Sequence, residues 1–185
     1  ESEFDFKERS KNIQDVKKIL DTINLKFWIT NGTALAAVRE KNWIPWDDDV
    51  DLDVLMEDYL KIEDQLFYLF LEKGFIVRQK HIHDNQRAKL SVFRGGEKTS
   101  IRPLYLDPKF KNNYYRLRNY YKYPRKFYEK EEKIFFLGNE YNIPSPSQDF
   151  LEWCYGKNWE KPLNSDDDDE YYSTEVQRSV NMFNK

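Results

Sequence analysis

The acidic segment that begins at residue 47 carries the side chains best suited to chemistry in this chain. It reads Trp46-Asp47-Asp48-Asp49-Val50-Asp51-Leu52-Asp53. Because side chains on a β-strand alternate between its two faces, Asp49, Asp51 and Asp53 should share one face while Val50 and Leu52 enter the core. Carboxylates held so close together repel one another unless a cation lies between them. We therefore predict that this strand binds a divalent metal ion.

Magnesium and manganese are the ions that such a site favours. Both suit carboxylate ligands, and Mg²⁺ keeps several coordination positions for water and substrate phosphate. The predicted metal ligands are Asp49, Asp51 and Asp53. An ion of this kind indicates a substrate that contains phosphate.

The segment before the acidic strand is typical of a phosphate-binding turn. An apolar run at 25–30 predicts a strand, Asn31-Gly32 is a turn signal, and Thr33 is placed to cap a short helix over 34–38. Backbone N–H groups and a hydroxyl at such a turn can hold phosphate oxygens. Strand, turn, short helix, loop and Asp-x-Asp strand form the layout of the nucleotidyltransferase fold. We therefore predict an α/β (α+β) domain with a mixed β-sheet flanked by helices.

The chain closely resembles the LicD and fukutin-related phosphotransferases in two separate blocks. The first runs Gly32-Thr33-Ala34-Leu35-Ala36-Ala37-Val38-Arg39 and continues at Ile44-Pro45-Trp46-Asp47-Asp48-Asp49-Val50-Asp51. The second contains Asn142-Ile143-Pro144, Asp149-Phe150-Leu151, Tyr155-Gly156 and 159–162. The resemblance implies transfer of a phosphorylated alcohol, such as phosphocholine or ribitol phosphate, from a CDP-activated donor to a glycan hydroxyl.

The expected catalytic residues are all in the acidic segment. Asp49 and Asp51 would hold one or two Mg²⁺ or Mn²⁺ ions, and Asp47 would either support these metal ligands or act as a base toward the acceptor. Such ions neutralise a diphosphate and lower the pKa of an attacking hydroxyl.

The expected substrate-binding residues lie on both sides of that segment. Gly32 and Thr33 would bind donor phosphate through the turn. Arg39 could contact the donor phosphate, or could simply be a favourable cation at a helix C-terminus. Lys89, on a later predicted strand, could neutralise the leaving nucleotide, or could be an ordinary exposed lysine.

The chain departs from the family pattern at one position that bears on catalysis. The family usually carries a third metal carboxylate before a proline on a later strand, and anchoring on Pro103 places Ser100 there. Three interpretations remain open. Asp53 supplies the missing charge; Glu97 or Asp107 supplies it after a register shift; or the chain has lost catalysis and only binds a nucleotide or glycan. A nucleotidyltransferase that uses a nucleoside triphosphate is a further alternative.

Composition narrows the class of protein. The 185 residues predict a single domain over 1–163, followed by an acidic and polar tail over 164–185. A formal net charge of −3 gives no general attraction to nucleic acid, and a single cysteine, Cys154, excludes an internal disulfide. No apolar run approaches the roughly 20 residues that span a bilayer. We expect a cytoplasmic protein, or the soluble domain of a longer membrane-associated one.

The remaining elements follow from periodicity and turn signals. Helices are expected at 10–22, 57–73 and from a capping box at 145–148 to Gly156, and strands at 49–55, 75–79, 89–93 and 99–106. Gly138-Asn139 predicts the turn of a hairpin between 133–137 and 140–143.

Three further patterns have simpler interpretations. Asp47-x-Asp49-x-Asp51 begins like an EF-hand loop but lacks its glycine and its final glutamate. His81-x-His83 lacks the partners of a structural zinc site. The tyrosine- and base-rich segment 114–130 could stack sugars or bases, or could bury its aromatic rings in the core.

Overall fold

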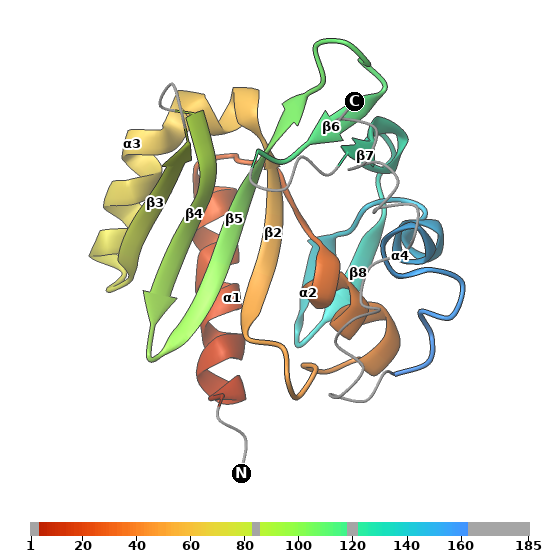
Figure 1. The fold of residues 1–185 in the computed structure, drawn as a ribbon. Coiled ribbons are helices and arrows are strands. Elements are labelled where there is room, and N and C mark those ends of the chain that lie inside the picture. Colours follow the sequence, from red (N-terminus) through yellow and green to blue (C-terminus); the bar gives the residue numbers. More distant parts are fainter. Residues whose placement is uncertain (1–3, 83–85, 118–121, 163–185) are drawn as a thin grey trace.

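The computed structural model describes residues 4–82, 86–117 and 122–162, so the predicted acidic tail and His83 lie outside the described part (Figure 1). The helical elements are α1 (Phe6–Thr22), α2 (Asn31–Leu35), the π-helix η1 (Ala36–Glu40), α3 (Met56–Glu72), the 3-10 turn η3 (Arg125–Tyr128) and α4 (Ser147–Tyr155). The strands are β1 (Phe27–Ile29), β2 (Asp49–Leu55), β3 (Ile76–Ile82), β4 (Gln86–Arg94), β5 (Glu97–Leu106), β6 (Asn113–Tyr115), β7 (Lys122–Pro124), β8 (Lys133–Phe136) and β9 (Asn139–Asn142).

The main sheet is mixed, as predicted. Its strands lie in the order β1-β2-β5-β4-β3, with β2 and β5 parallel and the other neighbouring pairs in this order antiparallel. The small β6–β7 hairpin continues from β5, and β8–β9 forms a separate hairpin. The parallel pairing sets β2 directly beside β5, with Asp51 opposite Ser100.

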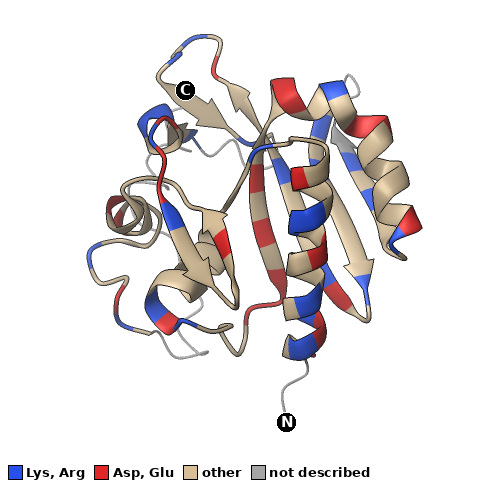
Figure 2. Ribbon diagram, turned by 180° about the vertical axis from the view of Figure 1, so that it is seen from behind, with Lys and Arg blue, Asp and Glu red and all other residues tan. Residues whose placement is uncertain are grey.

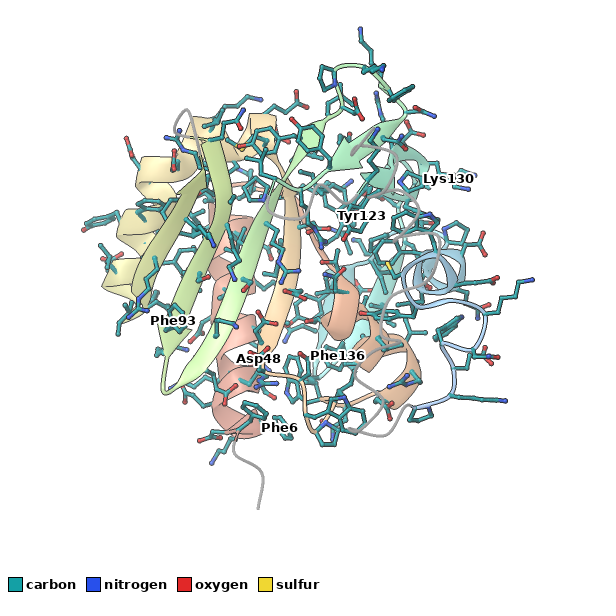
Figure 3. The ribbon with its side chains drawn as sticks, viewed as in Figure 1. Phe6, Asp48, Phe93, Tyr123, Lys130 and Phe136 are labelled. Atoms are coloured by element: carbon teal, nitrogen blue, oxygen red, sulfur yellow. The ribbon has the colours of Figure 1, made fainter. Side chains whose placement is uncertain are left out.

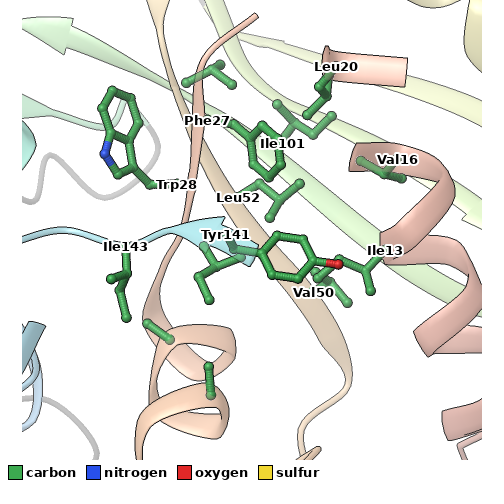
Figure 4. Packing of buried hydrophobic residues seen from close by; sticks show 14 of the residues in the cluster. Ile13, Val16, Leu20, Phe27, Trp28, Val50, Leu52, Ile101, Tyr141 and Ile143 are labelled. Carbon is green, nitrogen blue, oxygen red and sulfur yellow. The ribbon is translucent and has the colours of Figure 1, made fainter. Parts of the chain in front are cut away.

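Helices α1 and α3 cover one face of the sheet, and α2, β8–β9 and α4 lie beside its β2 side (Figures 1 and 2). Val50, Leu52 and Ile101 are fully buried, and they lie close to Ile13 and Val16 of α1 (Figure 4). Burying such side chains contributes roughly 1.5–3 kcal/mol each. The apolar half of the alternation thus fixes β2 in the core, and its acidic half must face the other way.

Most element boundaries agree with the expectations, and the differences have local causes. Helix α1 begins four residues earlier than predicted, because the Asp5 carboxylate accepts a hydrogen bond from the Glu8 N–H and so caps it. The capping box at 145–148 is wrong, since α4 begins after Pro146, and its first N–H, that of Ser147, donates to the distant Glu132 carboxylate at 3.0 Å. Its predicted end at Gly156 is confirmed.

The predicted hairpin at 133–143 is confirmed, but its turn is shifted by one residue. Phe136 pairs with Asn139, so the two turn residues are Leu137 and Gly138. Both have positive φ angles, which suits a tight two-residue turn whose twist matches the flanking strands.

Candidate functional site

Asp49 and Asp51 face a cavity of about 310 Å³ at the edge of β2. Each is at least nine-tenths buried, and acidic residues are visible as red bands along β2 (Figure 2). The same cavity contains Asp47 and Asp48 from the preceding loop, and Asp48 lies near the lower end of the sheet (Figure 3). Asp49 and Asp51 of β2 therefore share one face, as predicted, while Val50 and Leu52 lie in the core.

The full lining of the cavity combines acidic and basic side chains. It consists of Asn31, Gly32, Asp47, Asp48, Asp49, Asp51, Lys89, Lys98, Arg102 and Tyr155. The carboxylates come from β2 and its loop, and the cations come from β4 and β5. A metal and a phosphate group need opposite charges, and this cavity provides both within one volume.

Helix α2 is held against the acidic strand by two hydrogen bonds. The Thr33 hydroxyl accepts from the Asp51 N–H at 2.9 Å, and the Thr30 N–H donates to the Asp51 carbonyl at 3.0 Å. Thr33 is almost fully buried within α2 and is not its cap, so the predicted cap is wrong. Thr33 does not line the cavity, and its contact with donor phosphate stays a prediction. Gly32 and its neighbour Asn31 do line the cavity.

Strand β5 places a serine between two cations opposite the acidic face of β2. The Ser100 hydroxyl donates to Asp49 Oδ2 at 2.9 Å, and Lys98 Nζ lies 3.2 Å from the same oxygen. Arg102 Nη2 lies 2.6 Å from Asp51 Oδ1. Ser100 was identifiable from the sequence, whereas neither Lys98 nor Arg102 was among the predicted site residues. Their spacing of two residues on each side of Ser100 was the available signal.

The two carboxylates proposed as substitutes for Ser100 are bound elsewhere. Glu97 pairs with Arg9 of α1 on the helix-covered face of the sheet. Asp107 accepts from the Lys109 and Phe110 N–H groups and pairs with Lys122. Neither lines the cavity, so the register-shift interpretation is wrong.

Asp53 shares the face of Asp49 and Asp51 but lies beyond the cavity. It is fully buried, Arg116 Nη2 lies 2.6 Å from each of its oxygens, and the Tyr128 hydroxyl donates to it at 3.0 Å. A carboxylate with these partners is already neutralised and desolvated. We therefore leave Asp53 out of the metal site that we propose below.

The other two predicted substrate contacts differ in their placement. Arg39 pairs with Glu40 and donates to the Trp159 carbonyl at 3.0 Å, so it ties η1 to the segment after α4. It does not line the cavity, and its predicted contact with donor phosphate is not supported. Lys89 does line the cavity, as its predicted contact requires. Tyr155, the last residue of α4, lines it too; it belongs to the second block of family resemblance but was not among the predicted site residues.

Burial, assisted by repulsion between carboxylates, raises two carboxyl pKa values in the cavity. Burial, followed by repulsion from Asp51 and Asp49, raises the pKa of Asp47 to about 7. Burial also raises the pKa of Asp51 to about 6, and repulsion from Asp49 adds to this, although Arg102 acts against it. In the metal-free protein, partial protonation of Asp47 and Asp51 therefore reduces the repulsion that a bound cation would otherwise relieve.

The chemistry of these groups fits a hard divalent ion. Asp47, Asp48 and Asp49 can each bring one oxygen to within 4.8 Å of the others. Asp51 Oδ1 is buried and pairs with Arg102 Nη2 at 2.6 Å, so the other oxygen of Asp51 is the one that would serve an ion. An all-oxygen set of this kind is what Mg²⁺ and Mn²⁺ use.

The pH dependence of stability should report the raised carboxyl pKa values. Both carboxyls have an ordinary pKa of 3.8, so between about pH 4 and pH 7 the folded chain holds more protons than the unfolded chain. The free energy of unfolding of the metal-free protein should therefore fall as pH rises through this window. Urea denaturation at about pH 5 and about pH 7.5 measures the fall. Asp47→Asn should reduce it, and an equal fall in that variant would contradict the assignment.

Gly32 is required by the closeness of Asp47. A Cβ atom at position 32 would collide with Asp47 Oδ2. Gly32→Ala should therefore displace the Asp47 carboxylate or destabilise the fold by roughly 1–3 kcal/mol, as overpacking does. Urea denaturation measures the cost.

The matched control for this substitution removes the obstacle. In an Asp47→Ala background, Gly32→Ala should be neutral or stabilising by up to about 1 kcal/mol, because alanine favours a helix. An equal cost in both backgrounds would show that Asp47 is not the cause.

The remaining sequence candidates contribute little to this site. Asp49 and Asp51 belong to a regular strand, which excludes an EF-hand loop. In segment 114–130, Arg116, Tyr123, Phe127 and Tyr128 are buried, so these described members support the core. Cys154 is also buried. The His81-x-His83 pair lies outside the described side chains.

Comparison with known proteins gives one family match and two kinds of relative. The sequence model of the LicD/FKTN/FKRP nucleotidyltransferase domain matches residues 24–146. Ribitol-5-phosphate transferase FKTN of Homo sapiens is 25% identical over 173 residues, covering 82% of this chain and 33% of that protein. An uncharacterized protein of Rickettsia typhi is 34% identical over 71 residues, covering 38% of this chain and 23% of that protein. The chain thus spans a third or less of the length of these relatives.

Solved structures of low identity share the fold. The antibiotic-resistance factor ANT(2'')-Ia has a TM-score of 0.59 at 17% identity, covering 97% of this chain and 93% of that one. The lincosamide antibiotic adenylyltransferase LnuA has a TM-score of 0.52 at 10% identity, covering 90% and 95%. These likenesses confirm the predicted nucleotidyltransferase fold. Within the described residues, every helix is too short or too polar to cross a membrane.

Proposed function

Because this chain belongs to the LicD/FKTN/FKRP nucleotidyltransferase-domain family, we propose that it is a metal-dependent phosphotransferase. In the proposed reaction it moves a phosphorylated alcohol from a CDP-activated donor to a glycan hydroxyl. The relatives described as ribitol-5-phosphate transferases support ribitol phosphate as the transferred group, with phosphocholine as the other candidate. The observation that carries the proposal is the cavity in which the Asp-x-Asp carboxylates face Lys89, Lys98 and Arg102.

The proposed reaction breaks the phosphoanhydride bond of the donor and forms a phosphate ester bond to the acceptor. The acceptor hydroxyl attacks the phosphorus that bears the alcohol, the bond from that phosphorus to the bridging oxygen breaks, and CMP leaves with that oxygen. Mg²⁺ or Mn²⁺ on Asp49 and Asp51, with Asp47 and Asp48 nearby, would neutralise the diphosphate and acidify the hydroxyl.

The chain's own residues position the groups and carry the proton. Lys89, Lys98 and Arg102 would bind the diphosphate oxygens, because they form the basic side of the cavity. Asp47 would accept the proton of the acceptor hydroxyl, because its carboxylate lines the cavity beside the proposed metal ligands. Gly32 leaves room for that carboxylate beside the start of α2.

Calorimetry and CMP release test the proposal together. CDP-ribitol and CDP-choline are titrated into the protein with Mn²⁺ and with EDTA, and CMP is then measured as oligosaccharide acceptors are added. We expect at least one CDP-alcohol to bind only with Mn²⁺ and to release CMP when an acceptor is present. If CDP-alcohol binding and CMP release both persist in EDTA, the proposed metal dependence is wrong.

The same experiment separates the two alternatives that the sequence left open. Ser100 in place of a third carboxylate favours a chain that binds without transferring. Such a binder would bind CDP-alcohols and release no CMP with any acceptor. A nucleotidyltransferase would instead consume CTP or another nucleoside triphosphate and release pyrophosphate.

A further inference from the structure

Two carboxylate oxygens that a metal pair would need already have partners within the chain. Asp49 Oδ2 accepts from Ser100 and also lies 3.2 Å from Lys98 Nζ. Asp51 Oδ1 lies 2.6 Å from Arg102 Nη2. Ions in two-metal sites lie about 3.5–4 Å apart and share carboxylates, so both ions draw on the same small set of oxygens. Here Ser100, Lys98 and Arg102 of β5 already engage two of those carboxylate oxygens.

Arg102 is fixed in this position by a second contact. With the Asn31 amide oriented so that its oxygen faces the arginines, that oxygen accepts from Arg102 Nη1 and from Arg116 Nη1, each at 2.8 Å. The Arg102 side chain is about one-fifth exposed. A guanidinium held from two sides is a permanent charge of the site.

The charge of the cavity agrees with one ion better than with two. Its lining has four carboxylates and three cations, which leaves one net negative charge when all are ionised. One divalent ion leaves one net positive charge, and a second ion would leave three before any donor binds. Without the donor, a second ion would thus enter a cavity that is already positive.

From these contacts we infer that Lys98 and Arg102 occupy the β5 half of the site as fixed cations, so that the acidic side binds a single divalent ion through the remaining oxygens of Asp49 and Asp51, with Asp47 nearby. The inference rests on the proposed function in one respect, namely that the acidic side binds a metal. It deepens that function by making Arg102 a positioning residue, which performs through its charge what a second ion would do.

The test is a titration of the full chain with Mn²⁺ alone, followed by the electron paramagnetic resonance signal of free Mn²⁺. The wild-type chain should bind one Mn²⁺. Arg102→Met should bind Mn²⁺ about ten-fold more tightly at low ionic strength, the repulsion expected in water between a unit charge and a divalent ion about 6 Å apart. Arg102→Lys keeps the charge and should bind as the wild type does.

Two further variants sharpen the comparison. Arg78→Met removes a cation of β3 that stacks on Phe93 and does not line the cavity, so it should leave Mn²⁺ affinity unchanged. Ser100→Asp combined with Arg102→Met restores an acidic side chain and removes the fixed charge, and should bind two Mn²⁺.

The outcomes that overturn the inference are distinct. Two Mn²⁺ in the wild-type chain would overturn it and leave the proposed function standing. No Mn²⁺ at all would overturn both. Equal changes in Arg102→Met and Arg102→Lys would show that Arg102 acts through its shape, and would overturn its place as a fixed cation.

Discussion

Asp51→Asn is expected to lower the rate of phosphoryl-alcohol transfer by roughly 10²–10³-fold while leaving the fold intact. Asp51 is central to the acidic face, between Thr33, which supports its backbone, and Arg102, which pairs with its carboxylate. Asparagine keeps the shape of the side chain but removes the charge that would hold the ion. Phosphoryl transfer depends mostly on positioning and on charge stabilisation, so this one charge should carry a large part of the rate.

The measurement is CMP release from the CDP-alcohol donor at saturating Mn²⁺, with the urea midpoint as the check on folding. Asp58→Asn is the matched control, because Asp58 is a partly exposed aspartate of α3 that pairs with Lys61 of the same helix and does not line the cavity. It should retain the wild-type rate. An Asp51→Asn protein that stays active and ignores EDTA would remove Asp51 from the proposed site.

Local pattern was enough to predict the acidic side of the site. A strand has a period of two whatever its neighbours are, so Val50 and Leu52 in the core require Asp49 and Asp51 on the opposite face. The turn predicted at Asn31-Gly32 is instead the first part of α2, which begins at Asn31, three residues before the predicted helix.

The basic side depended on strand pairing, which no local pattern contains. Lys98 and Arg102 meet the carboxylates only because β5 lies parallel to β2 in the register that sets Asp51 opposite Ser100. Tyr155 reaches the cavity from α4, more than 100 residues after Asp51. Lys98 and Arg102 can be assigned to the site only when the order and register of the strands are known, and Tyr155 only when the position of α4 is known.

Capping and turn signals were the weakest local evidence. Thr33 is a good cap by type, but its hydroxyl instead accepts a hydrogen bond from the strand that it supports. Asp53 fits the alternation as well as Asp51 does, yet a distant arginine pairs with it. In both cases the polar side chain contacts a residue distant in sequence, Asp51 for Thr33 and Arg116 for Asp53, which local patterns cannot predict.

That distant partner, Arg116, gives the second large effect. Its guanidinium is buried against Asp53 and donates to the Tyr123 hydroxyl at 2.8 Å. Tyr123 belongs to β7 and is labelled in Figure 3. Arg116→Met would leave the Asp53 charge buried and unpaired. Removing one partner of such a pair costs about 3–5 kcal/mol, a large share of the stability of a typical domain.

Urea denaturation of Arg116→Met should therefore show a midpoint far below that of the wild type. The second variant, Asp53→Asn with Arg116→Met, removes the stranded charge and keeps an acceptor for the Tyr128 hydroxyl. It should recover a substantial part of the loss, because the cost lies in the uncompensated charge and not in the missing contact. A loss below about 1 kcal/mol in the single variant, or no recovery in the double one, would mean that the buried pair does not hold β2 to the segment around Arg116.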